Sequence, residues 1–103
     1  MYKITFDVPV THVEIVKSAM FTAGAGQIGD YGCCAWQVLG VGQFRPLAGA
    51  TPFIGTIDTL EHIAEYKVEM VCAEAYLQDA VAALKQNHPY QEPAYDVIQM
   101  INI

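Results

Sequence analysis

The sequence YKITFDVPVTHVEIVKSAMFTAG, residues 2–24, changes its hydrophobic period once, at a proline. Apolar and polar residues alternate over residues 2–8, which is typical of a half-buried strand, and Pro9 ends the alternation. Residues 13–20 then place apolar side chains at helical spacing. The chain is therefore predicted to begin with a strand followed by a helix.

Both ends of this predicted helix carry capping signals. Thr11 is a favourable N-cap, and Glu14, three residues later, completes a capping box. Gly24 lies where a glycine would end the helix. It is also the first of eight glycines, which all lie between Gly24 and Gly55. Glycine permits positive φ and close backbone approach, so the cluster predicts special backbone for a turn, a ligand contact or a subunit contact.

The later segments complete a βαββαβ order. The predicted elements, in chain order, are a strand over 33–39 that continues to 44, a loop over 45–59, a short turn over 60–64, a strand over 66–72, a helix over 76–86 and a strand over 95–100. This order is the ferredoxin-like pattern. We therefore expect a single α+β domain over residues 1–103, with an antiparallel sheet that carries both helices on one face.

Composition narrows the classes of partner. Apolar residues make up 53% of the chain and charged residues only 16%, so we expect a subunit interface. The five basic residues are spread singly and the net charge is −6, which argues against nucleic acid and against anionic membranes. No apolar run reaches the roughly 18 residues of a membrane-spanning helix.

Two features favour a cytoplasmic location. The first residues lack the apolar core and cleavage site of a signal peptide. Cys33, Cys34 and Cys72 are an odd number without a CxxC spacing, and we expect them to be small buried hydrophobes in a reducing compartment. If residues 33–39 form a strand, the two adjacent cysteines point to opposite faces.

The segment GAGQIGDY, residues 24–31, contains a literal G-x-G-x-x-G. Dinucleotide binding needs a strand before that motif and a helix after it, and here the order is reversed. Gly24, Gly26, Gly29 and Tyr31 are candidate ligand-binding residues in a looser nest of backbone N–H groups for a small anion. The alternative is a helix stop followed by a tight entry into the next strand.

A second dense segment, HPYQEPAY over residues 88–95, holds polar groups between two prolines that restrict the backbone. His88, Tyr90 and Glu92 are candidate ligand-binding residues. His88 and Glu92 are also candidate ligands of a divalent metal, although they supply fewer groups than a metal site needs. The alternative is a rigid connector in which His88 caps the preceding helix.

Three other features favour structural roles. His12 is expected at the surface in the first turn of the first helix. Trp36, the single tryptophan, is expected in the core or at an interface. A run of acidic residues is expected to be a solvated strand face: Glu61, Glu65, Glu69 and Glu74.

Four segments together resemble the YqfO-type proteins: GAGQIGDY (24–31), GQFRP (42–46), GATPFIG (49–55) and HPYQEPAYD (88–96). The chain looks like a stand-alone form of the insert domain found in larger members of the NGG-interacting-factor family. The resemblance implies a fold like that of the CutA and PII proteins, which are ferredoxin-like trimers. The larger relatives carry a dinuclear metal site in flanking halves that are missing here, so that site is not carried over.

The leading hypothesis is a non-catalytic homo-oligomer, with a trimer favoured, that serves assembly or senses a small anionic or nucleotide-like ligand or a metal ion. No catalytic residue is assigned in this interpretation. One alternative is a small metal-dependent enzyme that uses the segment 88–92. Another is a protein–protein adaptor that docks a partner through a sheet edge or the loop 46–55.

Overall fold

Alternation along β1 (Tyr2–Pro9) places Ile4, Phe6 and Val8 on one face of the sheet, where all three are buried. The computed structural model describes residues 1–103. The other elements follow in chain order: α1 (Val13–Thr22), β2 (Trp36–Phe44), β3 (Glu61–Cys72), α2 (Glu74–Asn87) and β4 (Tyr95–Gln99). The βαββαβ prediction is confirmed.

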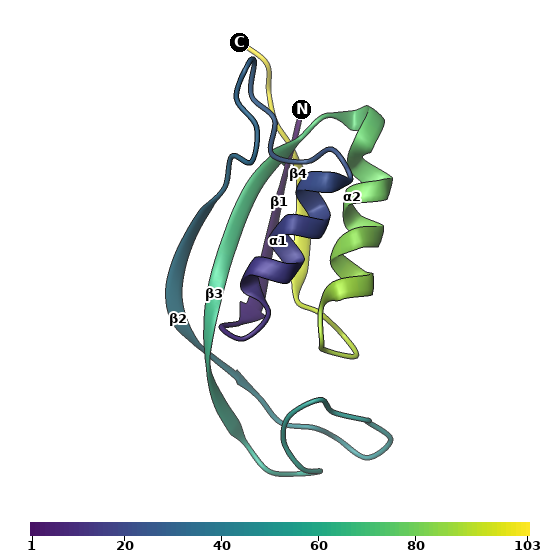
Figure 1. The fold of residues 1–103 in the computed structure, drawn as a ribbon. Helices are drawn as coiled ribbons and strands as arrows, with labels where there is room; N and C mark the ends of the chain where they lie inside the picture. Colours follow the sequence, from purple (N-terminus) through teal and green to yellow (C-terminus); the bar gives the residue numbers. More distant parts are fainter.

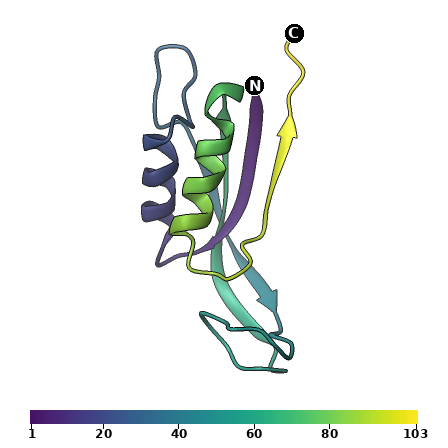
Figure 2. The same ribbon diagram turned by 90° about the vertical axis from the view of Figure 1, so that its right-hand side faces the viewer.

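The four strands form one antiparallel sheet in the order β2-β3-β1-β4 (Figure 1). This is the ferredoxin-like arrangement, with the two central strands from different halves of the chain. Both helices lie on the same side of the sheet (Figure 2). The core between them contains Phe6, Met20 and Leu84, all almost completely buried.

The start of α1 differs from the expected capping box. The N-cap is His12, and no side chain caps the helix. The hydroxyl of Thr11 is instead hydrogen-bonded to Nδ1 of His12 at 2.8 Å. Glu14 lies 3.1 Å from the ammonium of Lys17, so neither member of the predicted box reaches the other's backbone.

The end of α1 confirms the helix stop at Gly24, which has φ +112°. The N–H of Gly24 donates to the carbonyl of Phe21, and the N–H of Ala25 donates to the carbonyl of Met20. These two bonds form a Schellman motif, which satisfies carbonyls at the helix end. A side chain at Gly24 would also overlap the ring of Tyr76 on α2.

Two strand predictions were wrong. The segment 60–64 is not a turn, because β3 already begins at Glu61 and pairs there with Phe44 of β2. Cross-strand backbone pairing, rather than side-chain hydrophobicity, extends this polar end of the strand. The second strand begins at Trp36, since Cys33 has φ +55° and is exposed, so the expected buried role fails there.

The β2–β3 hairpin extends past the ends of the helices, giving a molecule of 46 × 24 × 24 Å (Figure 1). The loop over residues 45–60 lies at this far end. The connection over residues 23–35 lies at the opposite end, beside the two termini (Figure 1, Figure 2). No helix is long and apolar enough to cross a membrane.

Candidate functional site

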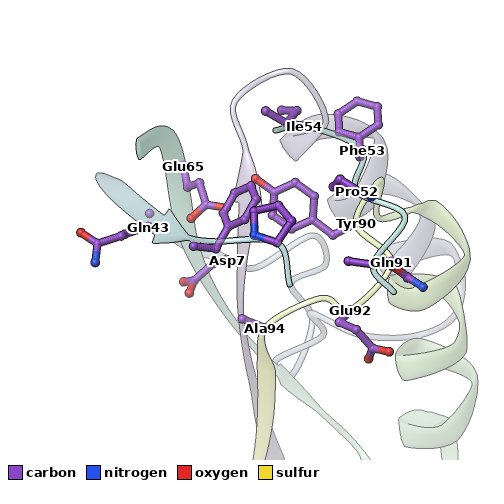
Figure 3. Close-up of a pocket in the computed structure, with 14 residues that line it drawn as sticks. Asp7, Gln43, Pro52, Phe53, Ile54, Glu65, Tyr90, Gln91, Glu92 and Ala94 are labelled. Carbon is purple, nitrogen blue, oxygen red and sulfur yellow. The ribbon is translucent and has the colours of Figure 1, made fainter. Parts of the chain in front are cut away.

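A cavity of about 340 Å³ opens at the far end of the sheet (Figure 3). Strands β1, β2 and β3, the loop after β2 and the connection between α2 and β4 all contribute to its walls. Three of the four segments that carry the family resemblance line it: 42–46, 49–55 and 88–96. The cavity therefore gathers motifs that are distant in the sequence.

Hydrogen bonds donated by backbone N–H groups hold the loop of residues 45–60 beside the cavity. The N–H of Asp58 donates to the carbonyl of Pro46 at 2.7 Å and closes the base of the loop. The N–H of Thr51 donates to Oε1 of Gln91 at 2.9 Å and ties the loop to the connection after α2. These bonds position a segment that contains neither helix nor strand.

His88 fixes the connection after α2. It is the C-cap of that helix, its N–H donates to the carbonyl of Leu84, and its residue surface is only 6% exposed. Nε2 lies 2.6 Å from the carbonyl oxygen of Asp7, and the N–H of Tyr90 donates to Nδ1 at 3.1 Å. A carbonyl only accepts and an amide N–H only donates, so this pair of bonds assigns the proton to Nε2.

Burial is the largest influence on His88 and lowers the pKa of its imidazole below the ordinary value. The hydrogen bond to the Asp7 carbonyl opposes this effect, and His12 adds to it. The ring is therefore neutral, with both nitrogens engaged by the backbone. This arrangement leaves no free ring nitrogen for a metal ion, and no group of three or more His, Cys, Asp and Glu side chains is placed to hold one.

Tyr90 presents a buried hydroxyl at the cavity. It forms no hydrogen bond of standard geometry, and the carboxylate of Glu65 is the acceptor that lies beside it. Burial first, then Glu65 and Asp7, raise the pKa of Tyr90, so the phenol stays protonated. The ring lies 5.8 Å from that of Phe44 and 6.4 Å from that of Phe53, centre to centre, and forms an aromatic wall with them.

Glu65 occupies space that a glycine leaves open. A Cβ atom built on Gly42 would overlap the carboxylate of Glu65 on the neighbouring strand. By contrast, a Cβ atom on Gly40 would meet nothing within 4 Å. Gly42 is therefore required for Glu65 to lie across β2 and line the cavity. The expectation that Glu65 belongs to a solvated strand face was wrong at this position.

The segment over residues 24–31 uses its backbone internally. The N–H of Gly26 donates to the carbonyl of Val71 at 2.8 Å, which anchors the segment to the end of β3. Ile28 and Tyr31 exchange two hydrogen bonds of 2.9 Å around Gly29, which has φ +55°. Like those of Gly24 and Ala25, these N–H groups already donate to carbonyls, whereas the N–H of Gly29 donates no hydrogen bond.

The structure does not bring the two predicted groups of site residues together. Gly24 contacts the ring of Tyr76 in the first turn of α2, whereas His88 caps the other end of that helix. A helix of 14 residues spans about 21 Å, which separates the two groups. Tyr90 and Glu92 both line the cavity, Glu92 with its carboxylate pointing away from the rings in Figure 3.

The sequence interpretation missed Asp7, Phe44, Phe53 and Glu65 as cavity residues. Phe44 and Phe53 lie inside two of the quoted motifs, so the motifs themselves pointed to them. Asp7 and Glu65 occupy the polar face of strands that pair beside each other, and their convergence depends on sheet register.

Comparison with known proteins supports the family resemblance. No family model matches the chain. A "GTP cyclohydrolase 1 type 2 homolog" of Mycobacterium leprae is 45% identical over 94 residues, which is 91% of this chain and 24% of the relative. One of Bacillus subtilis is 41% identical over 95 residues, covering 92% of this chain and 26% of the relative. The chain thus spans about a quarter of the length of these relatives.

Solved structures support the same resemblance. A Bacillus cereus protein related to NIF3 matches 98% of this chain and 26% of its own, with a TM-score of 0.83 and 36% identity. CutA1 from Pyrococcus horikoshii matches 100% of this chain and 86% of its own, with a TM-score of 0.71 and 15% identity. The similarity to CutA1 is a similarity of fold alone. The chain is therefore YqfO-like, and it corresponds to a CutA-like segment of the NIF3-related proteins.

Proposed function

We propose that this chain is a non-catalytic module that works as a homo-oligomer, a trimer, and binds a small ligand in the cavity. The observation that carries the proposal is an excess of exposed surface. The accessible area is 6581 Å² for 11.3 kDa, whereas a compact monomer of that mass exposes about 5,700 Å². The radius of gyration, 14.5 Å, likewise exceeds the roughly 13 Å expected.

The face of the sheet opposite the helices carries exposed apolar side chains. Trp36 and Val38 on β2 are 63% and 45% exposed, and Ile98 on β4 is 56% exposed. The pairing register places Trp36 beside Glu69 and Ile98 beside Lys3, so these side chains share the uncovered face. Apolar surface of this kind, mixed with a few charges, is typical of an interaction site.

A second copy of the chain is the partner that best fits this face. Apolar residues make up 53% of the sequence, but only 12 of them are buried in the core. An assembly would bury much of the remainder. Because the chain resembles CutA and PII proteins, a trimer is the assembly we propose.

The geometry of His88 supports a module without a catalytic histidine. A general base needs a nitrogen that is free to take a proton from substrate. Both nitrogens of His88 are hydrogen-bonded to the backbone, which favours a structural role for this residue. The cavity, with its aromatic wall, supports ligand binding, since small-molecule sites are concave and largely apolar.

The assembly is tested by light scattering on paired variants. Trp36→Glu places a charge on the uncovered sheet face and should reduce the mass to that of a monomer. Ile15→Glu places the same charge on α1, where Ile15 is 56% exposed on the helix side, and should leave the assembly intact. Equal masses for the two variants would contradict an interface on the sheet face.

The ligand half is tested separately, by a thermal-shift screen with amines, nucleotides and divalent cations. A rise in melting temperature with one class supports ligand binding. An unchanged melting temperature with every class of compound would contradict ligand binding but would not affect the proposed assembly.

A further inference from the structure

The charged residues that line the cavity all have one sign. Asp7, Glu65 and Glu92 line it, and no lysine, arginine or histidine does. Lys67 is the cross-strand neighbour of Asp7 but does not line the cavity. None of the three carboxylates forms a salt bridge; the two ion pairs of the chain are Lys3–Glu69 and Lys17–Glu14. A phosphate or carboxylate ligand would meet repulsion here, whereas a cation would meet unpaired negative charge.

The same cavity has an aromatic wall. Phe44 and Phe53 flank Tyr90, with rings tilted by 56° and 47° to it. Aromatic faces attract ammonium groups, especially those with methyl or alkyl substituents that also pack against the ring. In Figure 3 the carboxylate of Glu65 lies beside this group of rings, so the charge and the wall are adjacent.

The hydroxyl of Tyr90 and the carboxylate of Glu65 lie beside each other in the cavity. The hydroxyl forms no hydrogen bond of standard geometry, the carboxylate is the acceptor beside it, and the carboxylate can lie there because Gly42 has no side chain. An ammonium head placed against this carboxylate would also lie against the ring of Tyr90.

We propose that the cavity binds a small organic monocation, an alkylammonium or quaternary ammonium compound, with Asp7 and Glu65 balancing its charge and the Phe44–Tyr90–Phe53 wall covering its apolar surface. This inference rests on the ligand-binding half of the proposed function and names its class of ligand. It differs from the anionic ligand expected from the glycine motif, in which Gly24, Gly26 and Tyr31 donate their N–H groups to carbonyls. A volume of about 340 Å³ is sufficient for such a compound.

Isothermal titration of the full chain with choline chloride tests the proposal. The matched control ligand is the uncharged carbon isostere of choline, in which a tert-butyl group replaces the trimethylammonium group. The two have nearly the same shape and differ in charge. We expect saturable binding of choline and at least about tenfold weaker binding of the isostere, because the isostere gains neither the charge interaction nor the cation–π interaction.

Variants locate the binding. Glu65→Gln and Asp7→Asn keep the size of the side chains and remove the charge, and each should weaken choline binding by about tenfold. Asp30→Asn removes an exposed charge at the opposite end of the molecule and should leave binding unchanged. Amide NMR spectra of each variant establish that the fold is retained.

Three results would overturn the proposal: no saturable choline binding, equal binding of choline and its isostere, or unchanged binding in both cavity variants. Light scattering on the same samples separates this failure from that of the wider proposal. If the oligomer is intact but does not bind choline, the proposed cationic ligand is wrong and the proposed assembly stands. If the chain is a monomer that binds choline, the proposed assembly is wrong and the proposed cavity site stands.

Discussion

Replacing His88 by alanine should strongly destabilise the fold, because one buried ring supports two backbone groups. The substitution leaves the carbonyl of Asp7 and the N–H of Tyr90 without these partners. Both bonds are part-buried, and each contributes about 0.5–1.5 kcal/mol, so the expected loss is about 1–3 kcal/mol before any cavity is counted. This is a substantial share of the roughly 5–15 kcal/mol that stabilises a domain.

Two further variants at His88 separate the contributions of the two hydrogen bonds to stability. Asparagine can place its oxygen near the position of Nδ1 and so keep the bond from Tyr90, whereas glutamine can place its amide near Nε2 and keep the bond to Asp7. Each should therefore lose less stability than alanine. Urea unfolding followed by circular dichroism, at one fixed protein concentration, measures the series.

The pH dependence follows from the lowered pKa of His88. The unfolded chain takes up a proton near pH 6.5, the ordinary value, while the folded chain does so only at lower pH. The unfolded state therefore binds more protons below pH 6.5, and stability falls as the pH decreases, by up to about 1.4 kcal/mol per pH unit, until the folded pKa is reached. His88→Gln should lack this component.

Either of two results would contradict a stabilising role for His88. One is a His88→Ala variant as stable as the unmodified chain. The other is an identical pH dependence of the unfolding free energy in the unmodified chain and in His88→Gln between pH 7.5 and 5.5.

The other predictions concern glycines. Gly42→Ala should displace the carboxylate of Glu65 and weaken choline binding about tenfold in titration, whereas Gly40→Ala, where a Cβ meets nothing, should leave it unchanged. Gly24→Ala should destabilise the fold more than Gly49→Ala in urea unfolding: both have positive φ, which costs about 1–2 kcal/mol, but only at Gly24 would the Cβ also strike a tyrosine ring of α2. Equal losses for that pair would show that the ring contact is unimportant.

Elements with strong local signals could be predicted from the sequence. The alternation of apolar residues in β1 and the glycine that ends α1 could both be recognised in the sequence. Hydrophobic alternation and a glycine at a helix end depend only on neighbouring residues, so no knowledge of the tertiary structure is needed. The capping box at Thr11 failed because the neighbouring His12 side chain competes for the same hydroxyl. Competition of this kind between adjacent side chains is not visible in a motif.

The cavity could be predicted only in part. Tyr90 and Glu92 lie in a motif that was singled out, and both line it. Asp7 and Glu65 come from strands far apart in sequence, and their approach depends on the β1–β3 register and on the open space above Gly42. Strand β3, which carries Glu65, begins earlier than predicted. Its first residues pair with β2, and this cross-strand pairing, rather than a local strand preference, extends the strand.

Sedimentation equilibrium of the unmodified chain at micromolar concentration shows whether this chain works as an assembled module. We expect a single species of about three times 11.3 kDa, in which the uncovered sheet face is buried between subunits. A single species of 11.3 kDa would contradict it, because the exposed face with Trp36 would then need no partner of its own kind.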